Sequence, residues 1–165
     1  SATNIAPSMS NGTLARSADG YVVKPGSGAT ATVNVTVTNA DGSKKSLPGV
    51  EFRVKNVPNP TPYFAGKSVN DESVRKNELA AAQGVIAKME NFEFDLRFEV
   101  VSYTVTATIA GNVLEKPCRG PALTSEAKEV LNRVKSGQKV FIENIKAKGP
   151  DGSIRNLGAL SFKVI

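Results

Sequence analysis

The sequence contains no histidine and a single cysteine, Cys118, among its 165 residues. Without an imidazole, the chain has neither a Ser-His-Asp triad nor a Cys-His pair for nucleophilic catalysis. The same absence removes the histidine ligands on which many zinc and iron sites depend. One cysteine permits no disulfide within the chain and no cluster of thiolates. We therefore expect a protein that is not an enzyme and that holds no metal or other cofactor.

Tryptophan is also absent, and the aromatic residues are three tyrosines and seven phenylalanines. β-Branched residues are abundant instead, with 19 Val, 11 Thr and 7 Ile. Their side chains are stiff at χ1 and pack well on a pleated surface. The composition therefore predicts a mainly β fold.

Clustered positive charge is missing as well, although 21 basic residues against 15 acidic ones give a net charge of +6. The most basic region, residues 128–148, is interrupted by Glu129 and Glu143 and contains one aromatic residue, Phe141. Nucleic-acid binding normally combines a basic stripe with aromatic side chains that stack on the bases. We therefore expect no nucleic-acid partner.

No long apolar run is present. The most apolar stretch, residues 100–110, is far shorter than the roughly 20 residues that a membrane-spanning helix needs. The chain begins with Ser1 and shows no charged region followed by an apolar one, as a signal peptide would. We expect a fragment or a processed chain without a membrane span.

Two stretches of the sequence resemble each other at a separation of 110 residues: 41–55 (DGSKKSLPGVEFRVK) and 151–165 (DGSIRNLGALSFKVI). Self-similarity at a fixed separation indicates repeated structural units. Each copy starts with Asp-Gly, a strong turn signal, and ends in a short alternating segment. We predict that each copy is the closing hairpin of one domain.

The repeat divides the chain into a partial immunoglobulin-like domain at residues 1–55 and a β-rich domain at 63–165. Residues 56–62 (NVPNPTP) carry three prolines and are predicted to be a linker. The first domain reads as about four strands, near residues 12–16, 21–24, 30–38 and 50–55, whereas an immunoglobulin-like sandwich needs about seven. Such a half-sandwich exposes apolar faces and unpaired edges. We expect it to pair with a second chain in a homodimer or to pack loosely beside the second domain.

The second domain begins with an ambiguous region in which residues 78–83 suit a short helix that ends at Gly84. Strict alternation then predicts a strand over Phe92–Val100, and its phase changes between Val100 and Val101. Because a slip of one residue moves every side chain to the other face, this change predicts a bulge or a strand that changes sheets.

A second helix is predicted from a cap at Thr124 or Ser125 to Gly137, because apolar residues recur there at helical spacing. A strand near residues 140–145 and the final hairpin complete a β-rich domain with one or two short helices.

Charged residues form a stripe along one side of the predicted strand: Glu93, Asp95, Arg97 and Glu99. Paired carboxylates serve in glycosidases, and several together bind hard cations. Arg97 already compensates the negative charge, and a polar outer face is the usual pattern of an antiparallel strand. A solvated face is therefore the simplest interpretation, and a contact with a partner protein is the main alternative.

Two further motifs have ordinary explanations. Gly26–Ala31 spells G-x-G-x-x-A, but a dinucleotide site needs a helix directly after this turn, and a β-patterned segment follows instead. Cys118 lies between Pro117 and Gly120 beside cationic residues that would favour its thiolate. No histidine is present to activate it, so we expect an exposed loop thiol, which could also cross-link two chains and is dispensable for folding.

Longer stretches resemble a known family. Residues 76–100 (KNELAAAQGVIAKMENFEFDLRFEV) and 141–165 (FIENIKAKGPDGSIRNLGALSFKVI) are similar to signature stretches of the C-terminal periplasmic domain of the PorM/GldM family. Residues 10–37 (SNGTLARSADGYVVKPGSGATATVNVTV) resemble the second half of the immunoglobulin-like domain that precedes it. The resemblance covers nearly the whole chain and is closer to the PorM branch.

This resemblance implies a non-enzymatic part of the type IX secretion system and, in gliding bacteria, of the motility machinery. Proteins of the family are anchored in the inner membrane, where they pair with a PorL-type partner. Their dimeric periplasmic region reaches the PorK/PorN ring under the outer membrane. The present chain would then be periplasmic, would contact the ring through its C-terminal domain, and would lack the regions that meet PorL.

The partner contact that we would test first is the charged stripe of Glu93, Asp95, Arg97 and Glu99. The alternative function is a ligand-binding or adhesive immunoglobulin-like module, for instance for glycans. Sugar platforms usually need exposed tryptophan or tyrosine, and the absence of tryptophan argues against this alternative.

Overall fold

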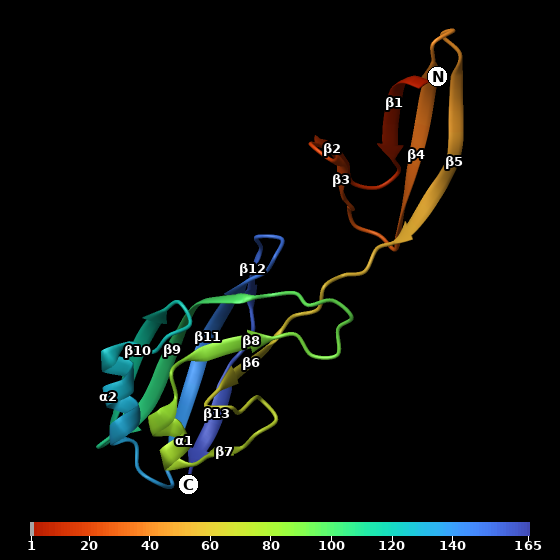
Figure 1. The fold of residues 1–165 in the computed structure, drawn as a ribbon. Coiled ribbons are helices and arrows are strands. Elements are labelled where there is room, and N and C mark those ends of the chain that lie inside the picture. The colour runs from red at the N-terminus through yellow and green to blue at the C-terminus, as the bar shows by residue number, and fades with distance from the viewer. Residues whose placement is uncertain (1) are drawn as a thin grey trace. The chain divides into compact units, whose positions relative to one another are not determined.

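The computed structural model describes residues 2–165 and divides the chain into two compact units, up to Val57 and from Pro58 onward. We call them unit 1 and unit 2 and describe each by itself (Figure 1). Antiparallel strands dominate both, and unit 2 adds two short helices. The predicted mainly β fold class is thus confirmed.

Unit 1 has five strands in two sheets. The larger sheet has the order β1-β4-β5, and β2 and β3 form a separate hairpin. The strands are β1 (Ala2–Met9), β2 (Thr13–Ser17), β3 (Gly20–Lys24), β4 (Thr30–Asn39) and β5 (Lys44–Arg53). β1 was not predicted, because ATNIAPSM lacks alternation and contains Pro7. Proline is tolerated there because β1 is an edge strand.

Strand β5 also begins earlier than predicted, at Lys44 rather than at Val50. It pairs with β4 directly after the turn, with Lys44 opposite Thr38. A bulge between Val33 and Val35 then accommodates Pro48 and Gly49, the residues that made this stretch look irregular.

Unit 1 buries very little apolar surface. Of the hydrophobic residues described in this unit, only Ala31 is buried. Val50 is 56% exposed and Phe52 is 53% exposed, although both lie on a strand. Unit 1 therefore has sheets but no core of its own.

Unit 2 is built around a sheet with the order β10-β9-β11-β13-β7, with β12 added alongside β11. β6 and β8 form a second, two-stranded sheet. The elements are β6 (Thr61–Phe64), β7 (Ser73–Val74), α1 (Lys76–Ala81), β8 (Val85–Lys88), β9 (Glu99–Ile109), β10 (Asn112–Arg119), α2 (Ser125–Arg133), β11 (Lys139–Lys148), β12 (Ile154–Asn156) and β13 (Leu160–Val164).

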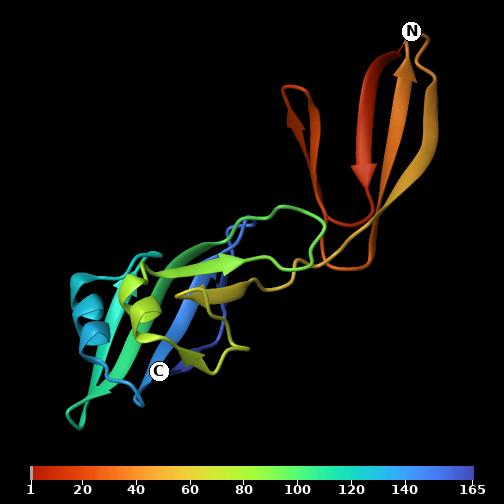
Figure 2. The same ribbon diagram turned by 60° about the horizontal axis from the view of Figure 1, so that its bottom comes forward.

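The helices and the β6–β8 pair lie against one face of the main sheet (Figures 1 and 2). Phe64, Leu79 and Val85 from this layer share one hydrophobic core with Tyr103 and Phe162 of the sheet. Thr61 and Pro62, which the sequence placed in the linker, lie in β6. They pair with Lys88 and Ala87, which are far away in the sequence, and the local run of prolines does not indicate this pairing.

Helix α2 and the change of phase in β9 follow the sequence. The Thr124 hydroxyl oxygen accepts a hydrogen bond from the Ala127 amide (3.2 Å), which caps the helix, and Ala127, Val130 and Leu131 are buried. In β9, Val100 and Tyr103 both face the core, because the pairing of β9 with β11 is irregular between them. The predicted bulge is therefore present.

Cys118 does not lie in a loop. It belongs to β10, opposite Tyr103, and is 1% exposed in the core. The loop was predicted because of Pro117. However, β10 is an edge strand, and a proline there can lie with its nitrogen toward solvent without loss of a hydrogen bond between strands.

The two copies of the sequence repeat form the same turn. In unit 1 the Asn39 amide donates to the Ser43 carbonyl (2.8 Å), and in unit 2 the Gly149 amide donates to the Ser153 carbonyl (2.9 Å). The first glycine after each aspartate has the positive φ that the turn requires, 82° at Gly42 and 81° at Gly152. Both copies thus close hairpins, as the repeat predicts.

Candidate functional site

The predicted partner contact lies on the connection between β8 and β9. Residues 92–98 are irregular, and β9 begins only at Glu99. The predicted strand over Phe92–Val100 is thus wrong for most of its length. Alternation predicts how a segment would lie on a sheet, but a strand also needs a neighbour with which to pair. In the described residues, β8 pairs with β6 instead.

The side chains of this segment nonetheless keep the predicted sidedness. Glu93, Asp95 and Arg97 are exposed, Phe98 is buried, and Phe92 and Leu96 are half-buried. The exception is Phe94, which is 60% exposed and meets Phe92 edge to face, with ring centroids 5.8 Å apart. The stripe is therefore on the surface, with an aromatic side chain in its middle.

Glu99 stands apart from the rest of the stripe, since it lies inside β9. It is exposed and stands opposite Lys148 of β11. An opposite-charge cross-strand pair of this kind stabilises a sheet by about 0.2–1 kcal/mol. The structure thus brings Glu93, Asp95 and Arg97 together on one connection and places Glu99 on the sheet beside it.

Phe98 anchors the end of the connection. Its ring lies under the Arg155 guanidinium, with the guanidinium carbon 5.1 Å from the ring centroid. Gly149 leaves room for it, because a Cβ at this position would lie 2.9 Å from Phe98 Cε1. The C-terminal end of the connection is therefore fixed at Phe98. The rest of the connection projects beyond the end of β8 in both views (Figures 1 and 2).

The loop between β10 and α2 also holds strand β8 in place. The Val85 amide donates to the Pro121 carbonyl (2.9 Å), and the Leu123 amide donates to the Gln83 carbonyl (2.9 Å). The Tyr103 hydroxyl donates to the same Pro121 carbonyl at 3.1 Å, and burial raises the pKa of this phenol. Gly84 allows this close approach of the two segments, because a Cβ there would lie 1.9 Å from the Pro121 oxygen.

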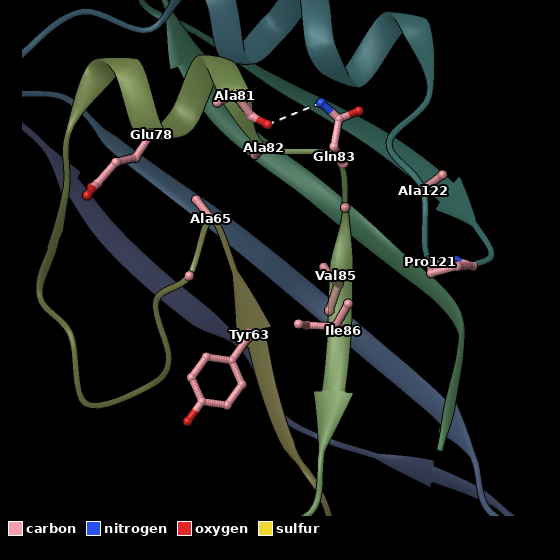
Figure 3. A pocket seen from close by; sticks show the side chains of 12 residues that line it. Tyr63, Ala65, Glu78, Ala81, Ala82, Gln83, Val85, Ile86, Pro121 and Ala122 are labelled. Atoms are coloured by element: carbon pink, nitrogen blue, oxygen red, sulfur yellow. Dashed lines mark hydrogen bonds between the residues drawn. The ribbon is translucent and has the colours of Figure 1, made fainter. Parts of the chain in front are cut away.

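Three hollows border β8. One of about 570 Å³ is mostly apolar and lies between the C-terminal end of α1 and the β6–β8 pair; Figure 3 shows Tyr63 and Ile86 on its wall. The Gln83 side-chain amide donates to the Ala81 carbonyl (3.1 Å) at its rim. A second, of about 560 Å³, lies between β8 and residues 97–100. A third, of about 520 Å³, lies between the end of β8 and residues 92–98.

Polar side chains on the β6–β8 pair form a small network beside these hollows. Glu90 accepts hydrogen bonds from the hydroxyls of Tyr63 and Thr61, and these bonds lower the pKa of its carboxyl. The same bond to Glu90 raises the pKa of Tyr63. The Lys88 ammonium lies 5.2 Å from the centroid of the Tyr63 ring. Sequence reasoning missed this network, because Thr61 lies in the proline-rich segment assigned to the linker and its partner Glu90 is 29 residues away in the sequence.

Nothing in this arrangement supplies general acid or base chemistry. Each shift keeps its group in its ordinary charge state near neutral pH, since the Glu90 carboxyl titrates lower and the Tyr63 phenol higher than usual. Across residues 2–165 there is no group of three or more acidic, histidine or cysteine side chains that could hold a metal ion.

The other candidates gain no support as sites. Gly26–Ala31 leads into strand β4, not into a helix. None of the helices in the described part of the chain is long and apolar enough to cross a membrane.

Comparison with known proteins matches both units. The family model described as GldM C-terminal domain matches residues 58–165, and the model described as GldM third domain matches residues 1–55. No curated protein sequence matches the chain. The matches meet near Val57, where the chain divides into its two units.

Proposed function

The chain belongs to the GldM family, and we propose that it is a non-enzymatic interaction module of the type IX secretion trans-envelope complex. GldM domains are structural components of the gliding-motility and type IX secretion apparatus and are not known enzymes. The observation that carries the proposal is the match of unit 2 over its whole length to the GldM C-terminal domain.

We further propose that unit 2 meets the PorK/PorN-type ring proteins associated with the outer membrane, as part of a periplasmic protein anchored in the inner membrane. The contact would include Glu93, Asp95, Arg97 and Glu99. The first three are exposed on a connection that begins at β8 and ends at the anchored Phe98. Surface charges of this kind mainly set association rate and specificity. We also propose that the chain belongs to the PorM branch of the family, as the resemblance of the whole sequence implies.

Charge reversal tests this contact. The double variant Glu93→Lys/Asp95→Lys should weaken binding of the chain to purified PorN-type ring protein and change its salt dependence, as measured by biolayer interferometry. The matched control is Glu126→Lys/Glu129→Lys, which reverses two exposed glutamates on α2. Because both variants alter the net charge equally, only a local contact separates them.

Two results would count against the proposal. If the wild-type chain does not bind the ring proteins at all, the proposed function is wrong. If it binds and both double variants bind alike, the charged stripe is only a solvated face.

A further inference from the structure

The segment 92–98 has the sequence of a strand but no strand beside it. Phe92, Phe94, Leu96 and Phe98 alternate with three charged residues, the pattern of a half-buried antiparallel strand. No strand in residues 2–165 pairs with this segment, and within it the Leu96 amide donates locally to the Phe94 carbonyl (3.0 Å). Residues 92–98 therefore have the sequence pattern of a paired strand, but the described part of a single chain offers no strand with which they pair.

The exposure of Phe94 points the same way. At 60% exposed, it is among the most exposed large apolar side chains of unit 2, and it lies beside the hollow of about 520 Å³ at the end of β8. Fully burying a phenylalanine side chain stabilises a protein substantially. Burial of the exposed Phe94 ring by a second protein surface would therefore be favourable.

The segment is complementary to itself when it runs antiparallel. With Asp95 on the two-fold axis, Glu93 of one copy stands opposite Arg97 of the other, and this happens twice. Phe92 then faces Phe98, and Phe94 faces Leu96. Opposite charges and apolar pairs directly across an antiparallel ribbon are stabilising. The remaining pair, Asp95 with Asp95, is repulsive, so this register sets two opposite-charge pairs against one like-charge pair.

The neighbouring register is less favourable. With Leu96 on the axis, Asp95 faces Arg97 twice, but Glu93 then faces Glu99 twice. Two like-charge pairs cancel what the two opposite pairs contribute. Complementarity of charge thus selects both the occupant and the register.

We propose that residues 92–98 pair with the same residues of a second copy of this chain as a two-stranded antiparallel ribbon centred on Asp95. The contact is isologous, since each copy gives and receives the same residues. All charged side chains of the ribbon fall on one face and all apolar ones on the other. On the apolar face, Leu96 of one copy covers Phe94 of the other. The charged face carries Glu93, Asp95 and Arg97 of both copies. This pairing goes beyond the proposed function and does not depend on the ring.

Disulfide cross-linking tests the register. In the full chain, Asp95→Cys places two thiols across the two-fold axis, within the Cα separation that a disulfide bridges. Under the oxidant diamide it should form a covalent dimer at least about tenfold faster than Glu126→Cys on α2, because pairing raises the effective thiol concentration. The native Cys118 is 1% exposed and does not compete. Faster cross-linking of Leu96→Cys than of Asp95→Cys would overturn the register.

A charge swap tests the pairing itself. Glu93→Arg and Arg97→Glu alone should each raise the dimer dissociation constant roughly tenfold, since each replaces two attractive pairs by two repulsive ones. The double variant Glu93→Arg/Arg97→Glu should restore it. A double variant no better than the singles, or Asp95→Cys no faster than Glu126→Cys, would overturn the proposal and leave the segment to another protein. Loss of ring binding with the cross-link intact would remove only the proposed ring contact.

Discussion

Single side chains fix where the connection between β8 and β9 leaves the body of unit 2. Phe98 is buried beneath Arg155 and fits against Gly149. Four residues earlier, Phe94 is mostly exposed. This gradient of burial within one alternating segment separates an anchored end from an end that a partner can cover.

Cys118 is the residue whose role the structure changes most. Because its side chain is buried, Cys118→Ser places a more polar hydroxyl in the core, and we expect a loss of about 1–3 kcal/mol in the free energy of unfolding. The exposed loop predicted from the sequence would give no more than about 0.5 kcal/mol. Urea melts of the wild type and the variant separate the two, and a change within the smaller range would contradict the buried position.

At the scale of elements, the repeated Asp-Gly turn is the feature that the sequence predicted best. Asp41 accepts a hydrogen bond from the Ser43 amide (2.9 Å), and Asp151 does the same from the Ser153 amide (3.0 Å). Beyond the turn the copies diverge. In unit 1 the pairs Val35–Leu47 and Val33–Val50 flank a bulge, whereas in unit 2 the corresponding strand is split into β12 and β13.

The turn in unit 2 should contribute to the acid sensitivity of the domain. Hydrogen bonds from Ser153 lower the pKa of the Asp151 carboxyl below its ordinary 3.8. A lowered folded-state pKa means that its contribution to stability is present above 3.8 and is lost as the pH falls through the folded value.

We therefore expect Asp151→Asn, whose side-chain oxygen still accepts from Ser153, to lose less stability than the wild type on acidification. The measurement compares the urea midpoints of both proteins at about pH 6 and about pH 2. Equal losses in the two proteins would show that the carboxylate is not held by the turn.

Local sequence signals predicted helix α2, the bulge in β9 and the closing hairpins, because capping, phase and turn chemistry act between near neighbours. They failed where long-range pairing decides. β6 begins inside a proline-rich stretch because β8 lies beside it. Residues 92–98 have strand-like alternation, but no strand within residues 2–165 pairs with them. For the candidate site, the sequence predicted which residues are exposed but not the backbone that carries them.

At the scale of the whole molecule, the two units differ in how they are stabilised. Unit 2 has a continuous core that joins its sheet, helices and β6–β8 pair. In unit 1, several apolar side chains on the strands are more than half exposed, including Ile5, Val50 and Phe52. Burying such a side chain fully is worth about 1.5–3 kcal/mol, so unit 1 gains most from an external surface.

We expect a homodimer in which unit 1 contributes to the interface. Light scattering over a dilution series should show the dimer, and Val50→Asp/Phe52→Asp should shift it toward monomer because the charges oppose burial of this face. A concentration-independent monomer whose residues 2–57 are protected from hydrogen exchange would contradict the half-sandwich interpretation.

We propose above all that the connection between β8 and β9 is a protein–protein contact. The most direct measurement replaces Asp95 by the photo-cross-linking residue p-benzoylphenylalanine in cells that assemble the apparatus. We expect adducts from this position with a ring protein and with a second copy of the same chain, and none from a matched position at Glu126. Adducts at position 126 but not at position 95 would contradict it.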